Sequence, residues 1–175
     1  MKDKLTPRRI AILALLIALN IVLNFFLRLP TPTGFVSLVE VGIILAAWYF
    51  GPQAGLIVGA LTGFLIDLLL GYPQWMFFSL LIHGSEGYLI GRVGSGSANV
   101  SKRILSIVLG GITMVIGYFI AGIILQLLNH AVVKTAVSIA IVEIPSNALQ
   151  VLVGALVASL IYVPFASLLA RTKLH

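Results

Sequence analysis

The residues best suited to chemistry lie in an apolar stretch near the C-terminus, at positions 139–150. Glu143, Asn147 and Gln150 are spaced i, i+4 and i+7, so a helix would present all three on one face. An ionisable group inside a membrane costs about 3 kcal/mol or more unless it meets a partner, a cavity or a ligand. This face therefore predicts a binding site for a polar small molecule, with Gln150 supporting the other two side chains.

A second polar pair lies in the apolar stretch 74–93. His83 and Glu86 are spaced i, i+3 and can face the same cavity as Glu143, or can pair with each other and serve only structure. Trp75 and Phe35 are the candidates for stacking on a flat heteroaromatic ring, whose edge the polar groups would satisfy. Trp75 is equally typical of an aromatic belt at the membrane surface.

Other polar residues allow simpler readings. Glu40 and Asp67 fall near the expected outer ends of two helices, where water could reach them. Asn20 and Asn24 can form hydrogen bonds between helices, and this is the favoured role for Asn20.

The chain lacks the motifs of several enzyme classes. It has no GxxxxGK[ST] loop, no HExxH, no recognisable nucleophile motif and no cysteine. His83, His130 and His175 are scattered and give no metal signature. We therefore expect no cofactor, no metal and no enzymatic activity in this chain.

The composition is that of an integral membrane protein. Of 175 residues, 60% are hydrophobic and only 9% are charged, and the mean hydropathy is +1.14. Soluble domains contain about 25% charged residues, so we expect a single membrane domain over residues 1–175. The net charge of +6 comes from basic residues at the ends and in one loop, which indicates topology and not a nucleic-acid surface.

The basic residues form three clusters, and the positive-inside rule places all three in the cytoplasm. The clusters are Lys2, Lys4, Arg8 and Arg9; Arg92, Lys102 and Arg103; and Arg171 and Lys173. At about 20 residues per span, four helices fit between the first two clusters and two between the last two. The sequence predicts an all-α six-helix bundle with both termini cytoplasmic.

Proline and glycine mark the borders of the predicted helices. Pro30, Pro32 and Gly34 make the first outer loop, Gly51-Pro52 an inner turn and Gly71-Tyr72-Pro73 an outer turn. The six helices are expected at about 7–28, 37–50, 52–70, 74–93, 103–128 and 135–170.

Small residues recur at the spacing that lets helices approach closely. Glycine occupies every fourth position from 51 to 63, a stripe that favours packing inside the bundle. Ala14 and Ala18 have the same spacing, which fits either internal packing or a docking stripe for another membrane subunit.

Three segments carry a resemblance to a known family. They are AILALLIA, which contains Ala14 and Ala18; FVSLVEVGIILAAWYFGPQAGLIVGALTGFLIDLL; and EIPSNALQVLVG. With the six short-looped helices, they resemble the substrate-binding S component of energy-coupling factor (ECF) vitamin transporters. The narrower similarity is to members for hydroxymethylpyrimidine or pyridoxine uptake in the bacterial plasma membrane.

The resemblance implies a mechanism and partners. Such proteins bind a vitamin or precursor from outside with high affinity, under a lid that would correspond here to about residues 29–37. The fourth, fifth and sixth helices supply most contacts. The alanines matched by Ala14 and Ala18 rest on a transmembrane coupling subunit, which joins two cytoplasmic ATPases, and the S component is thought to topple in the bilayer.

Three alternatives remain open from the residues alone. A small membrane enzyme could use Glu86, His83 or Asp67 as an acid or base, and would turn over substrate without a partner. A structural or regulatory subunit would use its polar groups only to join helices and would bind no ligand. A channel would need a continuous polar track, and the polar groups concentrate toward the predicted outer half.

Overall fold

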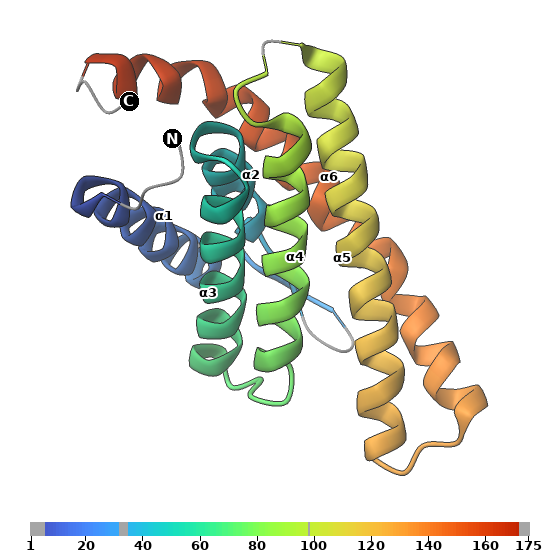
Figure 1. Cartoon of the computed structure of the whole chain (residues 1–175). Helices are drawn as coiled ribbons and strands as arrows, with labels where there is room; N and C mark the ends of the chain where they lie inside the picture. The colour runs from blue at the N-terminus through green and yellow to red at the C-terminus, as the bar shows by residue number, and fades with distance from the viewer. Residues whose placement is uncertain (1–5, 32–34, 98, 172–175) are drawn as a thin grey trace.

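The computed structural model describes residues 6–31, 35–97 and 99–171, with side chains described to Val163. It contains six helices and two short strands (Figure 1). The elements are α1 Pro7–Phe26, β1 Leu29–Pro30, β2 Phe35–Val36, α2 Val39–Phe50, α3 Pro52–Leu70, α4 Met76–Gly94, α5 Val100–Leu128 and α6 Val133–Arg171. The predicted all-α six-helix class is confirmed, and each helix end lies within three residues of its expected position.

Some sequence expectations fall outside this description. Lys2, Lys4, Lys173, Pro32 and Gly34 lie outside the described residues, as does the side chain of Arg171.

The α2–α3 and α4–α5 connections and the C-terminal part of α6 lie at one end of the bundle, and the α3–α4 and α5–α6 turns lie at the other (Figure 1). Which end faces the cytoplasm stays a prediction from the basic residues.

Local chemistry explains where the helices begin and end. The Thr6 hydroxyl caps α1 by accepting from the backbone N–H of Arg9 at 3.3 Å, and Pro7 follows as the first helical residue. Gly51 has φ +88° and joins α2 to Pro52, the first residue of α3. Gly71, at φ +83°, ends α3 in the left-handed conformation that only glycine adopts freely.

Four helices are long and apolar enough to cross a membrane: α1, α3, α5 and α6. The shortest helix, α2, has 12 residues and rises only about 18 Å against a hydrocarbon core of about 30 Å. Its residues from Val39 to Trp48 are all buried, and it contacts α1, α3, α4 and α6. Protein therefore surrounds α2, which carries polar groups to the middle of the bundle.

The glycine stripe of α3 packs against α4. A Cβ atom on Gly55 would lie 2.2 Å from the carbonyl oxygen of Gly87, and one on Gly59 would lie 2.1 Å from that of His83. Backbone is thus against backbone, and no side chain fits between. The expected internal packing role is confirmed for Gly55, Gly59 and Gly63, whereas Gly51 lies in the turn before α3.

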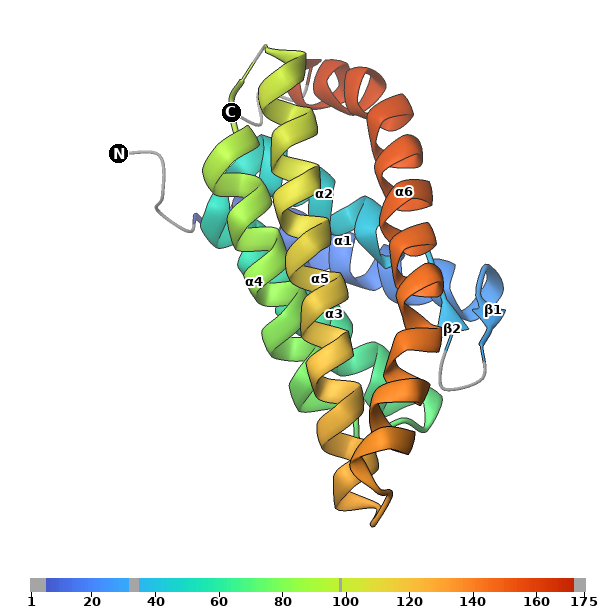
Figure 2. The same ribbon diagram turned by 90° about the vertical axis from the view of Figure 1, so that its right-hand side faces the viewer.

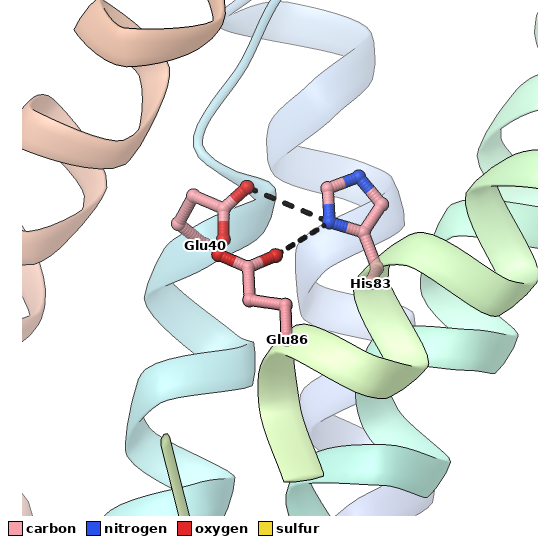
Figure 3. A group of neighbouring side chains, drawn as sticks. All are labelled: Glu40, His83 and Glu86. Carbon is pink, nitrogen blue, oxygen red and sulfur yellow. Dashed lines mark hydrogen bonds and ion pairs between the residues drawn. The ribbon is translucent and has the colours of Figure 1, made fainter. Parts of the chain in front are cut away.

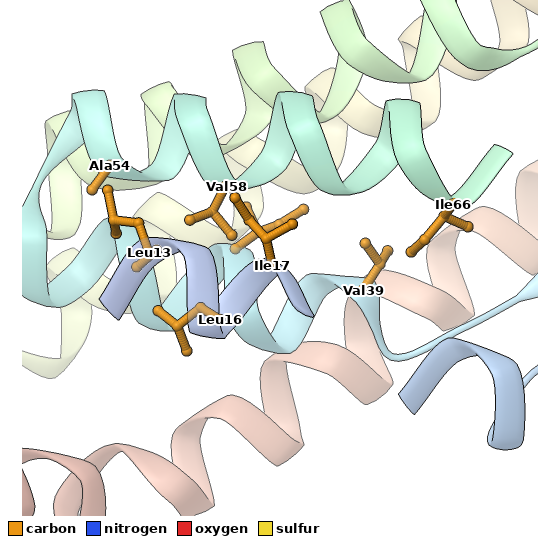
Figure 4. Close-up of a cluster of buried hydrophobic side chains, with 9 residues drawn as sticks. Leu13, Leu16, Ile17, Val39, Ala54, Val58 and Ile66 are labelled. Carbon is orange, nitrogen blue, oxygen red and sulfur yellow. The ribbon is translucent and has the colours of Figure 1, made fainter. Parts of the chain in front are cut away.

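Apolar packing joins α1, α2 and α3 on one side of the bundle (Figure 4). The cluster contains Leu13, Leu16, Ile17, Val39, Ile43, Ala46, Ala54, Val58 and Ile66. Asn20 fixes the same contact, because its amide donates to the carbonyl oxygen of Val39 at 3.0 Å. This confirms the interhelical role expected for Asn20. Ala14 and Ala18 lie on the opposite, exposed side of α1.

Arg103, one of the residues assigned to topology, also has a packing role. Its guanidinium carbon lies 3.8 Å from the centre of the Tyr162 ring, and its Nη2 donates to the Tyr162 hydroxyl at 2.7 Å. The Tyr49 hydroxyl donates to the Tyr162 carbonyl oxygen. These contacts hold the part of α6 around Tyr162 against α2 and α5.

Candidate functional site

A cavity opens between α3, α4, α5 and α6, with β2 at its mouth. Its volume is about 790 Å³, including the space at the opening. Figure 2 shows α6 along one side of the bundle with the two strands beside it. Six of the seven predicted binding residues line this cavity: Glu143, Asn147, Gln150, His83, Trp75 and Phe35.

The carboxylate of Glu143 lies at the wall where α6 faces the outer loop. Its Oε2 accepts a hydrogen bond from the Thr31 hydroxyl at 3.4 Å. Its Oε1 is buried and has no hydrogen-bond partner among the described residues. Asn147, one turn further along α6, lines the same wall. Glu143 is therefore available to a bound molecule and is also tied to the segment that the resemblance identifies as a lid.

Gln150 lines the cavity, but both of its polar atoms bond within the protein. Its Oε1 accepts from the backbone N–H of Ser37 at 2.8 Å, and its Nε2 donates to Oε1 of Glu40 at 3.1 Å. These bonds attach the start of α2 to α6. Gln150 thus positions the wall of the cavity.

His83 lies at the centre of a group of polar side chains from α2, α4 and α5, and Figure 3 shows the two glutamates from α2 and α4 beside it. Its Nδ1 is 2.9 Å from Oε2 of Glu86 and 3.6 Å from Oε1 of Glu40. Its Nε2 is 3.0 Å from the Tyr118 hydroxyl, which is 2.7 Å from Oγ of Ser79. Glu86, the seventh predicted residue, is not among the cavity-lining side chains and lies behind His83.

Glu40 and Asp67 are buried, although their positions near the expected helix ends allowed contact with water. Glu40 is 0% exposed because it belongs to the enclosed helix α2, and Asp67 is 7% exposed. The simple reading that both lie at the water-exposed surface is wrong. Asp67 lines the cavity and its Oδ2 has no partner among the residues described.

Asn24 of α1 also lines the cavity, and it is 1% exposed. Neither polar atom of its amide has a hydrogen-bond partner in the described part of the chain. The interhelical hydrogen bond considered for Asn24 is therefore absent there. A buried amide without partners is costly, and a bound molecule with donors and acceptors would remove that cost.

Aromatic side chains form the remaining walls. The rings of Trp75 and Tyr118 are 5.7 Å apart between centres, and those of Phe35 and Tyr72 are 5.6 Å apart. The sequence reasoning missed Tyr118. A signal for it exists, since Tyr118, Gly122 and Gln126 recur every four residues in the otherwise apolar C-terminal half of α5 and all line the cavity.

Flat aromatic walls and unpartnered polar atoms suit reversible binding of a flat, polar molecule. The fold and this cavity define a membrane-embedded protein that binds small solutes. The family model for the S component of the ECF-type riboflavin transporter matches residues 4–167. The chain therefore belongs to the family of ECF transporter S components, as the sequence resemblance indicated.

Relatives and a solved structure agree with this assignment. The chain is 36% identical over 123 residues to the thiamine precursor transporter HmpT of Lactococcus lactis subsp. cremoris, covering 69% of this chain and 70% of that protein. It is 38% identical over 99 residues to an uncharacterized protein of Pyrococcus woesei, covering 55% of this chain and 66% of that one.

One similar solved structure is described as the S component of a bacterial ECF transporter. The two chains have a TM-score of 0.73 and 25% sequence identity, and the match covers 93% of this chain and 97% of the other. The protein is thus a multi-pass component of a vitamin or vitamin-precursor transporter in the bacterial plasma membrane, and its family is not one of enzymes.

Proposed function

We propose that this chain captures a small aromatic vitamin precursor of the hydroxymethylpyrimidine or pyridoxine type from outside the cell. The observation that carries the proposal is the cavity itself. Aromatic rings border it, and Glu143, Asp67 and Asn24 each offer a buried polar atom that has no partner among the described residues. A flat ring with amino or hydroxyl substituents would stack on the rings and satisfy those atoms.

The names of the relatives differ in substrate, and the cavity chemistry supports a choice among them. The family model is described for riboflavin, and the relative in Lactococcus for a thiamine precursor. An aminopyrimidine offers an N–H donor beside a ring-nitrogen acceptor. The Asn24 amide can satisfy both groups, and Asp67 can accept a second N–H. This pairing favours a substituted pyrimidine.

The direct test is to identify the bound molecule and measure its affinity. The protein is purified in detergent, the copurifying small molecule is identified by mass spectrometry, and hydroxymethylpyrimidine, pyridoxine and riboflavin are each titrated by calorimetry. We expect the pyrimidine to bind most tightly. Tighter binding of riboflavin would contradict the substrate, and absence of binding by all three would contradict the proposed class.

Delivery requires partners that the family shares. We propose that the loaded chain meets a transmembrane coupling subunit through the exposed side of α1, where Ala14 and Ala18 lie, and that two cytoplasmic ATPases drive release inside. Small residues on an exposed helix face support close helix–helix contact in a membrane. Uptake by vesicles containing the complete complex, compared with vesicles lacking the ATPases, tests this coupling.

A further inference from the structure

A cluster of three ionisable side chains lies beside the cavity, at the centre of the bundle. Glu40 comes from α2, and His83 and Glu86 come from one face of α4. One oxygen of each carboxylate and one ring nitrogen lie within 4.8 Å of one another. All three side chains are buried, with exposures of 0%, 3% and 1% respectively. Figure 3 shows both carboxyl groups on the Nδ1 side of the imidazole.

The cluster has unused ligand atoms. Oε2 of Glu40 and Oε1 of Glu86 are buried and have no hydrogen-bond partner within the described residues. Neither glutamate is among the side chains that line the cavity, so a bound vitamin precursor would not touch them. When both glutamates are ionised, the two carboxylates carry two negative charges, and His83 can supply at most one positive charge. A small cation would supply the missing positive charge and would bind the carboxylate oxygens that have no hydrogen-bond partner.

We propose that Glu40, His83 and Glu86 bind one divalent transition-metal ion, with Zn²⁺ as the best match. Zinc accepts one histidine nitrogen and two carboxylate oxygens, with water completing four-fold coordination. A doubly charged ion balances both carboxylates and leaves a neutral site, which a membrane interior favours. The protein ligands are Nδ1 of His83 and one or both oxygens of each glutamate.

Neighbouring side chains hold two of the three ligands, His83 and Glu40, as ligands are held in known metal sites. A histidine that binds metal through one nitrogen donates its other ring N–H to a nearby acceptor. Here Nε2 of His83 has the Tyr118 hydroxyl at 3.0 Å, and that hydroxyl has Oγ of Ser79 at 2.7 Å. Oε1 of Glu40 accepts from Gln150 at 3.1 Å. These bonds fix the ring and one carboxylate toward the centre of the cluster.

The proposed ion differs in role from the transported molecule. It would lie behind His83, between α2 and α4, and would join the short buried helix to the wall of the cavity. Metal binding and vitamin binding can therefore be measured separately, and failure of one does not imply failure of the other.

The test uses the full chain with a tag that contains no histidine. The protein is stripped with a chelator, titrated with Zn²⁺ against a fluorescent competitor, and analysed for metal by mass spectrometry. We expect about one zinc per chain, and affinity at least about tenfold lower in Glu86→Gln and in Glu40→Gln. His130→Ala, at an exposed histidine, is the matched control and should bind zinc as the unmodified protein does.

A second measurement covers the case in which a variant fails to fold. Co²⁺ bound to the unmodified protein should give the visible absorption of four-coordinate cobalt, with nitrogen and oxygen ligands by X-ray absorption. Absence of stoichiometric zinc, or equal zinc affinity in folded Glu40→Gln and Glu86→Gln, would overturn the proposal. The cluster would then be neutralised by protons alone.

Discussion

Single side chains on the cavity-facing side of α6 have different roles, although their spacing makes them look equivalent. Glu143 keeps a buried carboxylate oxygen without a partner among the described residues, whereas both polar atoms of Gln150 are bonded inside the protein. We propose that Glu143 contacts the bound molecule, whereas Gln150 connects α6 to the start of α2. This difference leads to two separable predictions.

Replacing Glu143 should weaken binding without unfolding the protein. Glu143→Ala removes a carboxylate that would accept a hydrogen bond from the bound molecule, and a hydrogen bond to a charged group contributes about 1.5–3 kcal/mol. We therefore expect affinity to fall by about ten- to a hundredfold in a calorimetric titration with hydroxymethylpyrimidine. The matched control is Ser159→Ala, which removes an exposed α6 hydroxyl bonded to its own helix. Unchanged affinity in Glu143→Ala would remove Glu143 from the site.

Replacing Gln150 should instead lower stability. Gln150→Leu has a similar size but leaves the Ser37 N–H and the Glu40 carboxyl without their partner, at a cost of about 1–3 kcal/mol. The readout is the thermal unfolding temperature in detergent, compared with Ser138→Ala, whose exposed hydroxyl bonds within its own helix. Equal unfolding temperatures would show that the hydrogen bonds of Gln150 to Ser37 and Glu40 do not contribute to stability.

At the level of elements, the fold depends on close contact between α3 and α4. Gly59 lies against the backbone of His83, so the same contact that packs the helices also sets the height of the histidine at the cavity wall. A substitution at Gly59 therefore disturbs the packing of α3 against α4, and it affects the cavity only through the resulting shift of His83.

We expect Gly59→Ala to destabilise the protein by about 1–3 kcal/mol, since the added Cβ would stand 2.1 Å from a backbone oxygen and the helices must separate. Gly122→Ala is the control, because its Cβ would meet Ala140 at an ordinary 3.6 Å. Denaturation in detergent compares the two. A loss in Gly122→Ala as large as in Gly59→Ala would contradict the packing argument.

The sequence predicted those features that depend on local chemistry. Proline and glycine mark the helix ends at Gly51, Pro52 and Gly71, and a period of 3.6 residues brings Glu143 and Asn147 to one wall. These signals lie within a few residues of one another along the chain, and tertiary packing does not alter them.

What the sequence could not predict depends on how helices pack. Glu40 is 43 positions before His83, and only the burial of the short helix α2 brings the two together. Hydropathy does not distinguish an apolar helix in lipid from one inside protein. Asp67 was likewise interpreted from its place near a helix end, and Asn24 from its capacity for an interhelical hydrogen bond, although the burial of both depends on the neighbouring helices.

For the whole molecule, the capture and the delivery that we propose would use different faces. The cavity opens on one side of the bundle, whereas Ala14 and Ala18 lie on the exposed side of α1, away from the apolar cluster that holds this helix. Lipid tolerates a large apolar side chain at such positions, but a docked helix does not. A bulky substitution there therefore distinguishes a docking face from a lipid-facing surface.

Ala14→Trp with Ala18→Trp should leave ligand affinity of the isolated chain unchanged and weaken assembly with the coupling subunit. Overpacking a close helix contact costs about 1–3 kcal/mol, or about five- to a hundredfold in the assembly constant. Copurification and vesicle uptake measure this loss. Ile116→Trp is the control, since Ile116 is an exposed apolar residue of α5. Normal assembly and uptake in the double variant would mean that these alanines face only lipid, and the docking surface would have to be sought elsewhere on the bundle.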